Sequence, residues 1–308
     1  MKILFDSHTH INNDGYSEEE RAQLIAVIED SEVAYVMDVG FDLPSSERAV
    51  SDAALLPWCY AAVGVHPHDT KTMTEEIYEK IRRLAGQPKV QAIGEIGLDF
   101  YYNHSDAEDQ RYWFRRQIRL ANELHMPIVI HAREADQETM DILKEEGAFS
   151  EERCGWFPPR PGTGIGRKAG AQTTQKASRA GEGGQAEACD CTENCCMEKD
   201  ARVLLHCFSG SRELAEQYVK LGATISIAGP VTYKNNRKTS EVVSAIPIEY
   251  LLVETDAPYL TPEPHRGKKN QSPYVAYTAR RVALLKGISY EEAARRTLEN
   301  AKRFYGID

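Results

Sequence analysis

Short apolar stretches alternate with longer amphipathic segments along most of the chain. Within each short stretch the apolar residues follow one another without alternation, which is typical of strands buried on both faces of a parallel sheet. These stretches are residues 2–10, 33–40, 58–66, 90–99, 127–134, 202–210, 223–229 and 250–258. The pattern therefore predicts an α/β fold built on a parallel sheet.

The longer segments carry the period and the end signals of helices. Segment 17–30 begins with Ser17 as the expected N-cap, and Glu20 follows three residues later, as in a capping box. Further helices are expected over residues 74–86, 106–125 and 211–222. Because strands alternate with helical segments in this way, the order predicts a (β/α)8 TIM barrel.

One interval in this repeat is too long for a single strand and helix. The predicted strands end at residues 10, 40, 66, 95, 131, 206, 229 and 256. A βα unit needs roughly 30 residues, and only the interval from 131 to 206 is much longer than that. The excess coincides with residues 150–200, which are rich in Gly, Ser, Thr, Pro and Ala and end in a cysteine cluster. We therefore expect residues 1–308 to form one barrel, with a flexible Gly/Cys-rich insertion at 150–200 between the fifth and sixth strands.

The composition is that of a folded globular protein. Of the 308 residues, 42% are apolar and 27% are charged, which excludes a mostly disordered chain, a collagen-like fibre and a dense disulfide scaffold. The length fits a barrel of about 250 residues with an insertion. The formal net charge of −10 argues against nucleic acid coating the whole surface. A nucleic-acid partner would therefore need a local basic patch.

Two features bear on the compartment in which the protein acts. The first residues, MKILFDSHTHI, contain no apolar run long enough for a signal peptide, and no other stretch approaches the length of a membrane span. Without such a signal, the seven cysteines are expected to be reduced thiols. These features predict a cytoplasmic protein without a membrane partner, and they leave the oligomeric state open.

Four cysteines lie close together in the insertion, at Cys189, Cys191, Cys195 and Cys196. Four thiolates can form a tetrahedral site for zinc or another thiophilic ion, so a second metal site is one interpretation. Their spacing lacks the paired C-x2-C of well-known zinc sites. A reduced loop without a metal is therefore the alternative interpretation.

Candidate metal ligands recur where the predicted strands end. His8 and His10 are two residues apart, so both imidazoles lie on one face of an extended chain and can reach one ion. The other candidates, one at each of four further strand ends, are Glu95, His131, His206 and Asp256. A buried His or Glu is often only a hydrogen-bonded packing residue, but all six share the same position at the carboxyl end of a strand. Six nitrogen and oxygen ligands suit two ions about 3.5–4 Å apart that a carboxylate bridges.

Seven motifs in order along the chain resemble one family, the TatD-type metal-dependent hydrolases, which include the TatD deoxyribonucleases. The motifs are DSHTHI, GVHPHD, AIGEIGLD, VIHARE, LHCFSG, ETDAPYL and PEPHRGKKNQ. The resemblance extends from residue 2 to about residue 305 and excludes the 150–200 insertion.

The resemblance implies an amidohydrolase-like barrel with a dinuclear centre of Mg, Mn or Zn ions. It assigns His8, His10 and Asp256 to one ion, His131 and His206 to the other, and Glu95 as the bridge. The implied reaction is hydrolysis of DNA phosphodiester bonds, often from the 3′ end. Catalysis would then depend on Glu95 and on Asp256, which could orient the attacking water or accept its proton.

Contacts to a DNA substrate require further residues. His66 follows the third strand and is expected to contact a phosphate or a metal ligand. Arg266 follows the eighth strand, and its planar guanidinium suits a phosphate. The neighbouring Lys268 and Lys269 are either part of the same patch or solvated. Two further groups are either ordinary surface residues or contacts to nucleic acid: the basic run Lys234, Arg237 and Lys238, and the aromatic residues Tyr101, Tyr102 and Tyr259.

Two other functions remain open at this point. The same metal chemistry could hydrolyse another ester, such as a small phosphoester or an acylated tRNA, because this fold serves many substrates. Alternatively, the insertion could bind a partner, with hydrolysis as a secondary function.

Overall fold

The computed structural model describes residues 1–161 and 197–308, and within them eight parallel strands form one barrel sheet. The strands, in their order around the sheet, are β1 (Leu4–Thr9), β2 (Val33–Val39), β3 (Cys59–Val63), β4 (Val90–Asp99), β5 (Ile128–Arg133), β8 (Val203–Leu205), β9 (Thr224–Ile227) and β10 (Leu251–Val253). A parallel bridge between Thr9 and Ala257 joins the last strand position to the first. The predicted TIM barrel is confirmed, and each strand lies within its predicted stretch.

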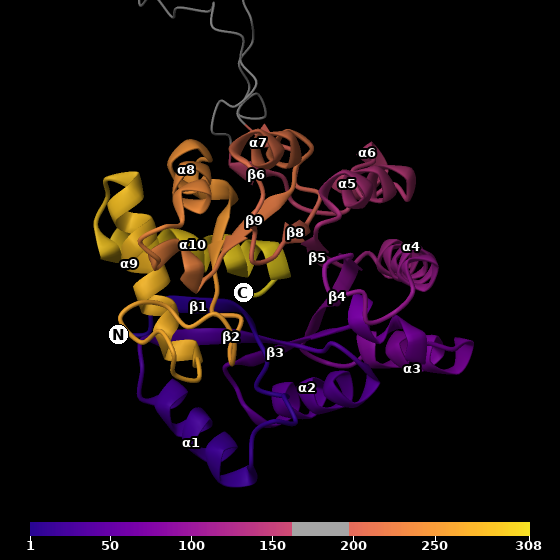
Figure 1. The fold of residues 1–308 in the computed structure, drawn as a ribbon, viewed down its shortest axis with the longest axis horizontal. Helices are drawn as coiled ribbons and strands as arrows, with labels where there is room; N and C mark the ends of the chain where they lie inside the picture. The colour runs from indigo at the N-terminus through magenta and orange to yellow at the C-terminus, as the bar shows by residue number, and fades with distance from the viewer. Residues whose placement is uncertain (162–196) are drawn as a thin grey trace, which may run out of the picture.

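Helices surround the strands on the outside of the barrel (Figure 1). The α-helices are α1 (Glu18–Glu29), α2 (Leu43–Leu55), α3 (Glu75–Ala85), α4 (Ala107–Glu123), α5 (Asp136–Glu145), α6 (Glu151–Gly155), α7 (Arg212–Lys220), α8 (Arg237–Ala245), α9 (Val275–Lys286) and α10 (Tyr290–Tyr305). Short 3-10 helices are η1 (Pro67–Thr72), η3 (Gly229–Thr232), η4 (Ile248–Tyr250) and η5 (Ser272–Tyr274). The predicted capping box is present, because the Ser17 hydroxyl accepts from the Glu20 N–H and the Glu20 carboxylate accepts from the Ser17 N–H.

The interior of the barrel is closed by apolar residues at the amino ends of its strands. Side chains from seven of the strands, including Phe5, Val129 and Leu252, form one buried cluster. Phe304 and Tyr305 of α10 belong to the same cluster, and the Tyr305 hydroxyl donates to the Ser7 carbonyl over 2.9 Å. Because α10 fills this end, the barrel is open only at the carboxyl ends of the strands, which we call the mouth.

The two ends of the 150–200 segment are structured. Besides α6, the structure contains an antiparallel pair of short strands, β6 (Arg160–Pro161) and β7 (Met197–Glu198). Flexibility is therefore a prediction only for residues 162–196, which lie outside the described residues. The cysteine cluster Cys189, Cys191, Cys195 and Cys196 lies outside them as well.

Buried arginines attach this segment to the amino ends of the strands. Arg153, fully buried in α6, donates to the carbonyls of Met126 and Ala201, which come just before β5 and β8. The segment therefore joins the barrel at the end opposite the mouth.

Arg160 makes the second attachment. It is fully buried, pairs with Asp200 over 3.0 Å and donates to the Thr224 hydroxyl at the start of β9. Its guanidinium also lies over the Tyr250 ring, 4.0 Å from the centroid. A buried charge is tolerated only when it is paired and hydrogen-bonded, as it is here.

Replacing residues 162–196 by a two-residue Asn-Gly turn should leave the barrel folded. Because β6 and β7 already pair as a hairpin, a type I′ turn can join them. Each halving of a loop lowers its closure cost by about 0.6 kcal/mol, so we expect an equal or higher melting temperature by differential scanning calorimetry. Arg160→Ala is the control. It removes one of the two arginines that pair with Asp200, leaving Arg303 at 3.2 Å, and should lower the melting temperature. Unfolding of the shortened chain would contradict the hairpin arrangement.

Candidate metal centre

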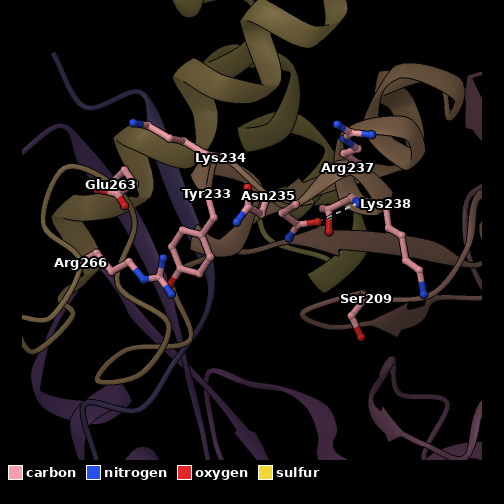
Figure 2. A pocket seen from close by; sticks show the side chains of 10 residues that line it. Ser209, Tyr233, Lys234, Asn235, Arg237, Lys238, Glu263 and Arg266 are labelled. Carbon is pink, nitrogen blue, oxygen red and sulfur yellow. Dashed lines mark hydrogen bonds between the residues drawn. The ribbon is translucent and has the colours of Figure 1, made fainter.

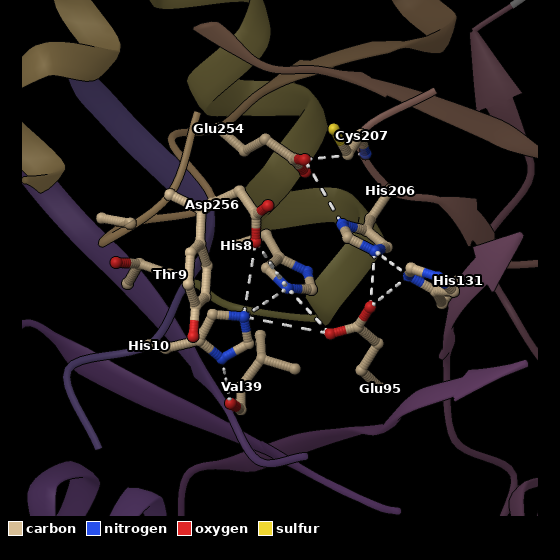
Figure 3. Close-up of polar contacts among 12 residues, drawn as sticks. His8, Thr9, His10, Val39, Glu95, His131, His206, Cys207, Glu254 and Asp256 are labelled. Carbon is tan, nitrogen blue, oxygen red and sulfur yellow. Dashed lines mark hydrogen bonds and ion pairs between the residues drawn. The ribbon is translucent and has the colours of Figure 1, made fainter. Parts of the chain in front are cut away.

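All six predicted metal ligands meet at the mouth of the barrel (Figure 3). Each comes from the carboxyl half of a strand or from the three residues that follow it, so five strands bring the side chains to one point. Four of them are buried to 8% exposure or less, and the side chains of the other two, His131 and Asp256, are 18% and 14% exposed. The structure thus brings the whole set together at a place with limited access to water.

Glu95 lies at the centre of this cluster. Its Oε2 is 3.4 Å from His8 Nε2 and 3.9 Å from His10 Nε2. Its Oε1 is 2.6 Å from His206 Nε2 and 2.9 Å from His131 Nδ1. The two carboxylate oxygens therefore face two separate groups of imidazoles, which is the arrangement of a bridging ligand.

Besides the group of His8, His206 and Glu254, two groups of potential ligands lie in this cluster. His8, His10 and Asp256 form the first, and His10 Nε2 is 3.4 Å from Asp256 Oδ1. His66, Glu95 and His131 form the second, with His66 Nε2 3.5 Å from Glu95 Oε1. In each group the ligand atoms lie within 4.8 Å of one another. Three nitrogen and oxygen donors converging in this way fit a divalent cation.

His206 lies between these two groups. Its ring stacks on that of His8 with 4.0 Å between centroids, and its Nε2 is 3.4 Å from His131 Nδ1. Its Nδ1 is 3.4 Å from Glu254 Oε1, which also accepts from the Cys207 N–H over 2.7 Å. Glu254 is fully buried, so it is placed to orient the His206 ring from behind.

Electrostatics keep the central carboxylate ionised. Burial alone would raise the pKa of Glu95, but the neighbouring His206 and His66 hold it well below its usual value. Burial likewise opposes protonation of His10, yet the Asp256 carboxylate raises the pKa of His10 to about 8. The cluster thus combines ionised carboxylates with imidazoles. A bound cation would replace the protons that the imidazoles otherwise carry.

The backbone is specialised around the site. Asp256 has a φ of 56° and Cys207 a φ of 43°, both in the left-handed region that non-glycine residues rarely adopt. Gly97, with a φ of 150°, allows β4 to approach β5, because a Cβ there would lie 1.9 Å from the His131 carbonyl oxygen. Such conformations are typical of sites where position matters more than local stability.

The two predicted substrate-contact residues lie in different places. His66 lines the same cavity as the candidate ligands, which has a volume of about 710 Å³. Arg266 lies outside that cavity, in a neighbouring hollow. Lys269, predicted to be either part of the same patch or solvated, pairs with Glu20 over 2.8 Å.

Asp99 is a site residue that the sequence reasoning missed. It is fully buried at the end of β4, and its Oδ2 lies 3.0 Å from His131 Nε2 and 2.9 Å from His68 Nε2. Its Oδ1 accepts from the N–H groups of Tyr101 and Tyr102. The sequence could have indicated Asp99, because it follows Glu95 by four positions on a strand, and residues at even spacing lie on the same face.

An α/β barrel with imidazole and carboxylate groups converging at its mouth is typical of metal-dependent hydrolases. Proteins with similar sequences belong to the same class. The chain is 37% identical over 306 residues to the uncharacterized metal-dependent hydrolase YabD of Bacillus subtilis, covering 99% of this chain and 100% of that protein. It is 29% identical over 310 residues to a protein of Erwinia tasmaniensis described as the 3′-5′ ssDNA/RNA exonuclease TatD, with coverages of 99% and 100%. The sequence profile of the family described as TatD related DNase matches residues 5–155 and 182–306. The chain belongs to this family.

Solved structures show the same fold. The crystal structure of YjjV, a TatD homologue from Escherichia coli, superimposes with a TM-score of 0.76 at 23% sequence identity, covering 100% of this chain and 99% of that one. In the part of the chain that the structure describes, no helix is both long and apolar enough to cross a membrane.

Replacing Asp99 by Asn should weaken metal binding while leaving the six candidate ligands in place. The amide would present N–H groups to His131 and His68, where the carboxylate now accepts, so the His131 ring would lose its fixed orientation. Loss of such a supporting contact typically lowers metal affinity by about 10–100-fold, which isothermal titration with Mn²⁺ would measure. The exposed Asp109→Asn on α4 is the matched control. Equal affinities of both variants would remove Asp99 from the site.

Proposed function

We propose that the protein is a metal-dependent deoxyribonuclease that hydrolyses phosphodiester bonds of DNA, as a 3′-5′ exonuclease, with two divalent ions at the barrel mouth. The observation that carries the proposal is Glu95, whose two oxygens face separate groups of ligands at 2.6–3.9 Å. The relative named as a 3′-5′ ssDNA/RNA exonuclease supports the choice of substrate and polarity.

In this proposal each of the two ions has its own set of ligands. His8, His10 and Asp256 would hold one ion and His131 and His206 the other, with Glu95 between them. His66 Nε2, 3.5 Å from Glu95 Oε1, is an additional candidate on the second side. Two bound divalent ions supply a nucleophile at neutral pH and neutralise the charge that develops on the phosphate. Nitrogen and oxygen donors of this kind accept Mg²⁺, Mn²⁺ or Zn²⁺.

The chain's own residues would perform the remaining steps. Asp256 lies on the cavity wall with its carboxylate ionised, because its pKa is lowered: burial opposes this shift, but the neighbouring His10 and His8 outweigh it. It can therefore orient the attacking water and accept its proton. His66, almost fully buried on the same wall, would contact the scissile phosphate. The limited exposure of the cavity strengthens each of these interactions.

A second function on the same site is hydrolysis of another ester, such as a small phosphoester or an acylated tRNA. It is favoured by the cavity itself, where Arg133 is the one Lys or Arg among the lining residues that the structure describes. A substrate that fits entirely into about 710 Å³ would not need a basic path across the surface. Arg266→Ala distinguishes the two, because it should weaken action on DNA and not on a substrate confined to the cavity.

Nuclease assays combined with metal analysis test the proposed function. The protein is stripped with a chelator, reconstituted with Mg²⁺, Mn²⁺ or Zn²⁺, and incubated with single-stranded DNA labelled at the 5′ or the 3′ end. A 3′-5′ exonuclease should shorten the 5′-labelled strand stepwise and release labelled mononucleotide at once from the 3′-labelled strand. We expect two equivalents of metal by elemental analysis. No cleavage with any ion would refute the nuclease proposal.

A further inference from the structure

A second hollow lies beside the metal cavity at the mouth of the barrel (Figure 2). It has a volume of about 650 Å³ and is bounded by the loops that follow β9 and β10 and by the first turn of α8. Ser209, in the loop after β8, lines both this hollow and the metal cavity. A chain-like ligand whose reacting group lies at the metal site can therefore continue directly into the hollow.

The lining of this hollow, which we call the basic hollow, is strongly cationic. Its charged residues are four cations, Lys234, Arg237, Lys238 and Arg266, and one anion, Glu263. Among the described residues none of the four cations forms an ion pair. Arginines on α4 behave differently, since Arg115 pairs with Glu146 and Arg116 with Glu75. In a chain of net charge −10, this concentration of unpaired cations attracts anions to one place.

Two of the cations are directed into the hollow. The guanidinium of Arg266 lies over the ring of Tyr233, 4.4 Å from its centroid, and the Tyr233 hydroxyl donates to the Thr261 carbonyl over 3.0 Å. This packing fixes the planar fork of Arg266 while leaving its N–H groups without a carboxylate, as phosphate binding requires. Lys238 extends towards Ser209 (Figure 2), which also lines the metal cavity.

We propose that the basic hollow binds phosphate groups of a single-stranded nucleic acid beyond the scissile bond, and so makes the enzyme prefer polynucleotides to dinucleotides. This proposal rests on the proposed nuclease function, because it assumes that a phosphodiester bond is cleaved at the metal site. Both its charge and its position favour phosphate binding in this hollow. It offers cations that form no ion pair with a described residue, and it adjoins the cavity that is lined by candidate metal ligands. A mononucleotide or small ester held in the metal cavity would leave these cations unused.

The test is a double variant, Lys238→Gln/Arg266→Gln, compared with Arg83→Gln/Lys220→Gln. The control removes one Arg and one Lys that are exposed in the last turns of α3 and α7. Those turns lead into strands at the amino end of the barrel, away from the mouth. Both doubles change the net charge equally, so a general electrostatic effect would appear in both.

Binding is measured first, by fluorescence anisotropy of a labelled 20-nucleotide thymidylate strand on each double placed in a Glu95→Gln background, over a series of NaCl concentrations. We expect the hollow variant to bind at least about tenfold more weakly than the control at low salt. Its slope of log affinity against log salt should fall by about 0.7 for each lost phosphate contact. Equal affinity and slope for the two doubles, or no binding by their common parent, would overturn the inference.

Hydrolysis is measured second, with Glu95 intact, on the 20-nucleotide strand and on a thymidine dinucleotide. The ratio of kcat/KM for the strand to kcat/KM for the dinucleotide should fall at least about tenfold in the hollow variant and stay constant in the control. A constant ratio in both would overturn the inference. If the parent hydrolyses neither substrate, the nuclease proposal fails, while the anisotropy result still decides whether the hollow binds nucleic acid. Should the double variant unfold, Lys238→Gln alone, at an exposed position, replaces it.

Discussion

Replacing Glu95 by Gln should lower turnover on DNA by about 10²–10³-fold, the size of effect seen when support for transition-state charge is removed from an active site. Gln keeps the shape of the side chain but can offer an oxygen to one side of the site only. The other side would receive an amide N–H, which repels a cation. Because Glu95 contacts both groups of ligands, we expect both ions to bind more weakly.

The same variant should remain folded. The barrel interior is held by the apolar cluster that includes Phe5, Val129 and Phe304, and Glu95 lies outside it. Turnover, metal content and melting temperature are measured together, with the exposed Glu47→Gln on α2 as the control. A Glu95→Gln enzyme that turns over at the normal rate with full metal content would contradict the bridging assignment. A lost fold would instead show that the carboxylate is structural, and Glu95→Asp would then be needed to separate the two roles.

The barrel and its cluster could be predicted because both follow from local patterns. Continuous apolar runs mark strands buried on both faces, and a polar residue at the end of such a run must lie at the mouth. His8 and His10 show this most directly, since their spacing of two places both rings on one face of the extended chain at the end of β1. The same rule would have identified Asp99, four residues after Glu95.

Other features depend on contacts between distant parts of the chain and could not be predicted in this way. Arg160 resembles any other charged residue in a polar segment, yet it is fully buried against Asp200. Arg266 lies in the loop after β10 and Lys238 in the first turn of α8, and only the folded barrel places them around one hollow. Local sequence therefore indicates which residues reach the mouth, whereas the surfaces between loops require the structure.

Replacing Asp256 by Asn should reduce turnover by about 10²–10⁴-fold, the usual contribution of a general base. The substitution keeps the size of the side chain but removes its negative charge and its ability to accept a proton. His8 and His10 would remain as ligands, so most of the bound metal should be retained. Since the Asp256 carboxylate is what raises the pKa of His10 to about 8, against the effect of burial, the variant ring would also be neutral over a wider pH range and available to a cation.

Single-turnover hydrolysis and metal content of the same Asp256→Asn preparation decide between two roles for this residue. Slow chemistry at full metal content would place Asp256 at the attacking water, because a weakened metal site would then not account for the lost activity. A parallel loss of metal and activity, reversed by higher Mn²⁺ concentration, would make Asp256 chiefly a ligand, consistent with its Oδ1 lying 3.4 Å from His10 Nε2 and 3.8 Å from His8 Nε2. Normal turnover would exclude both roles. His66, which lies on the other side of the site with its Nε2 3.5 Å from Glu95 Oε1, would then be the candidate proton acceptor.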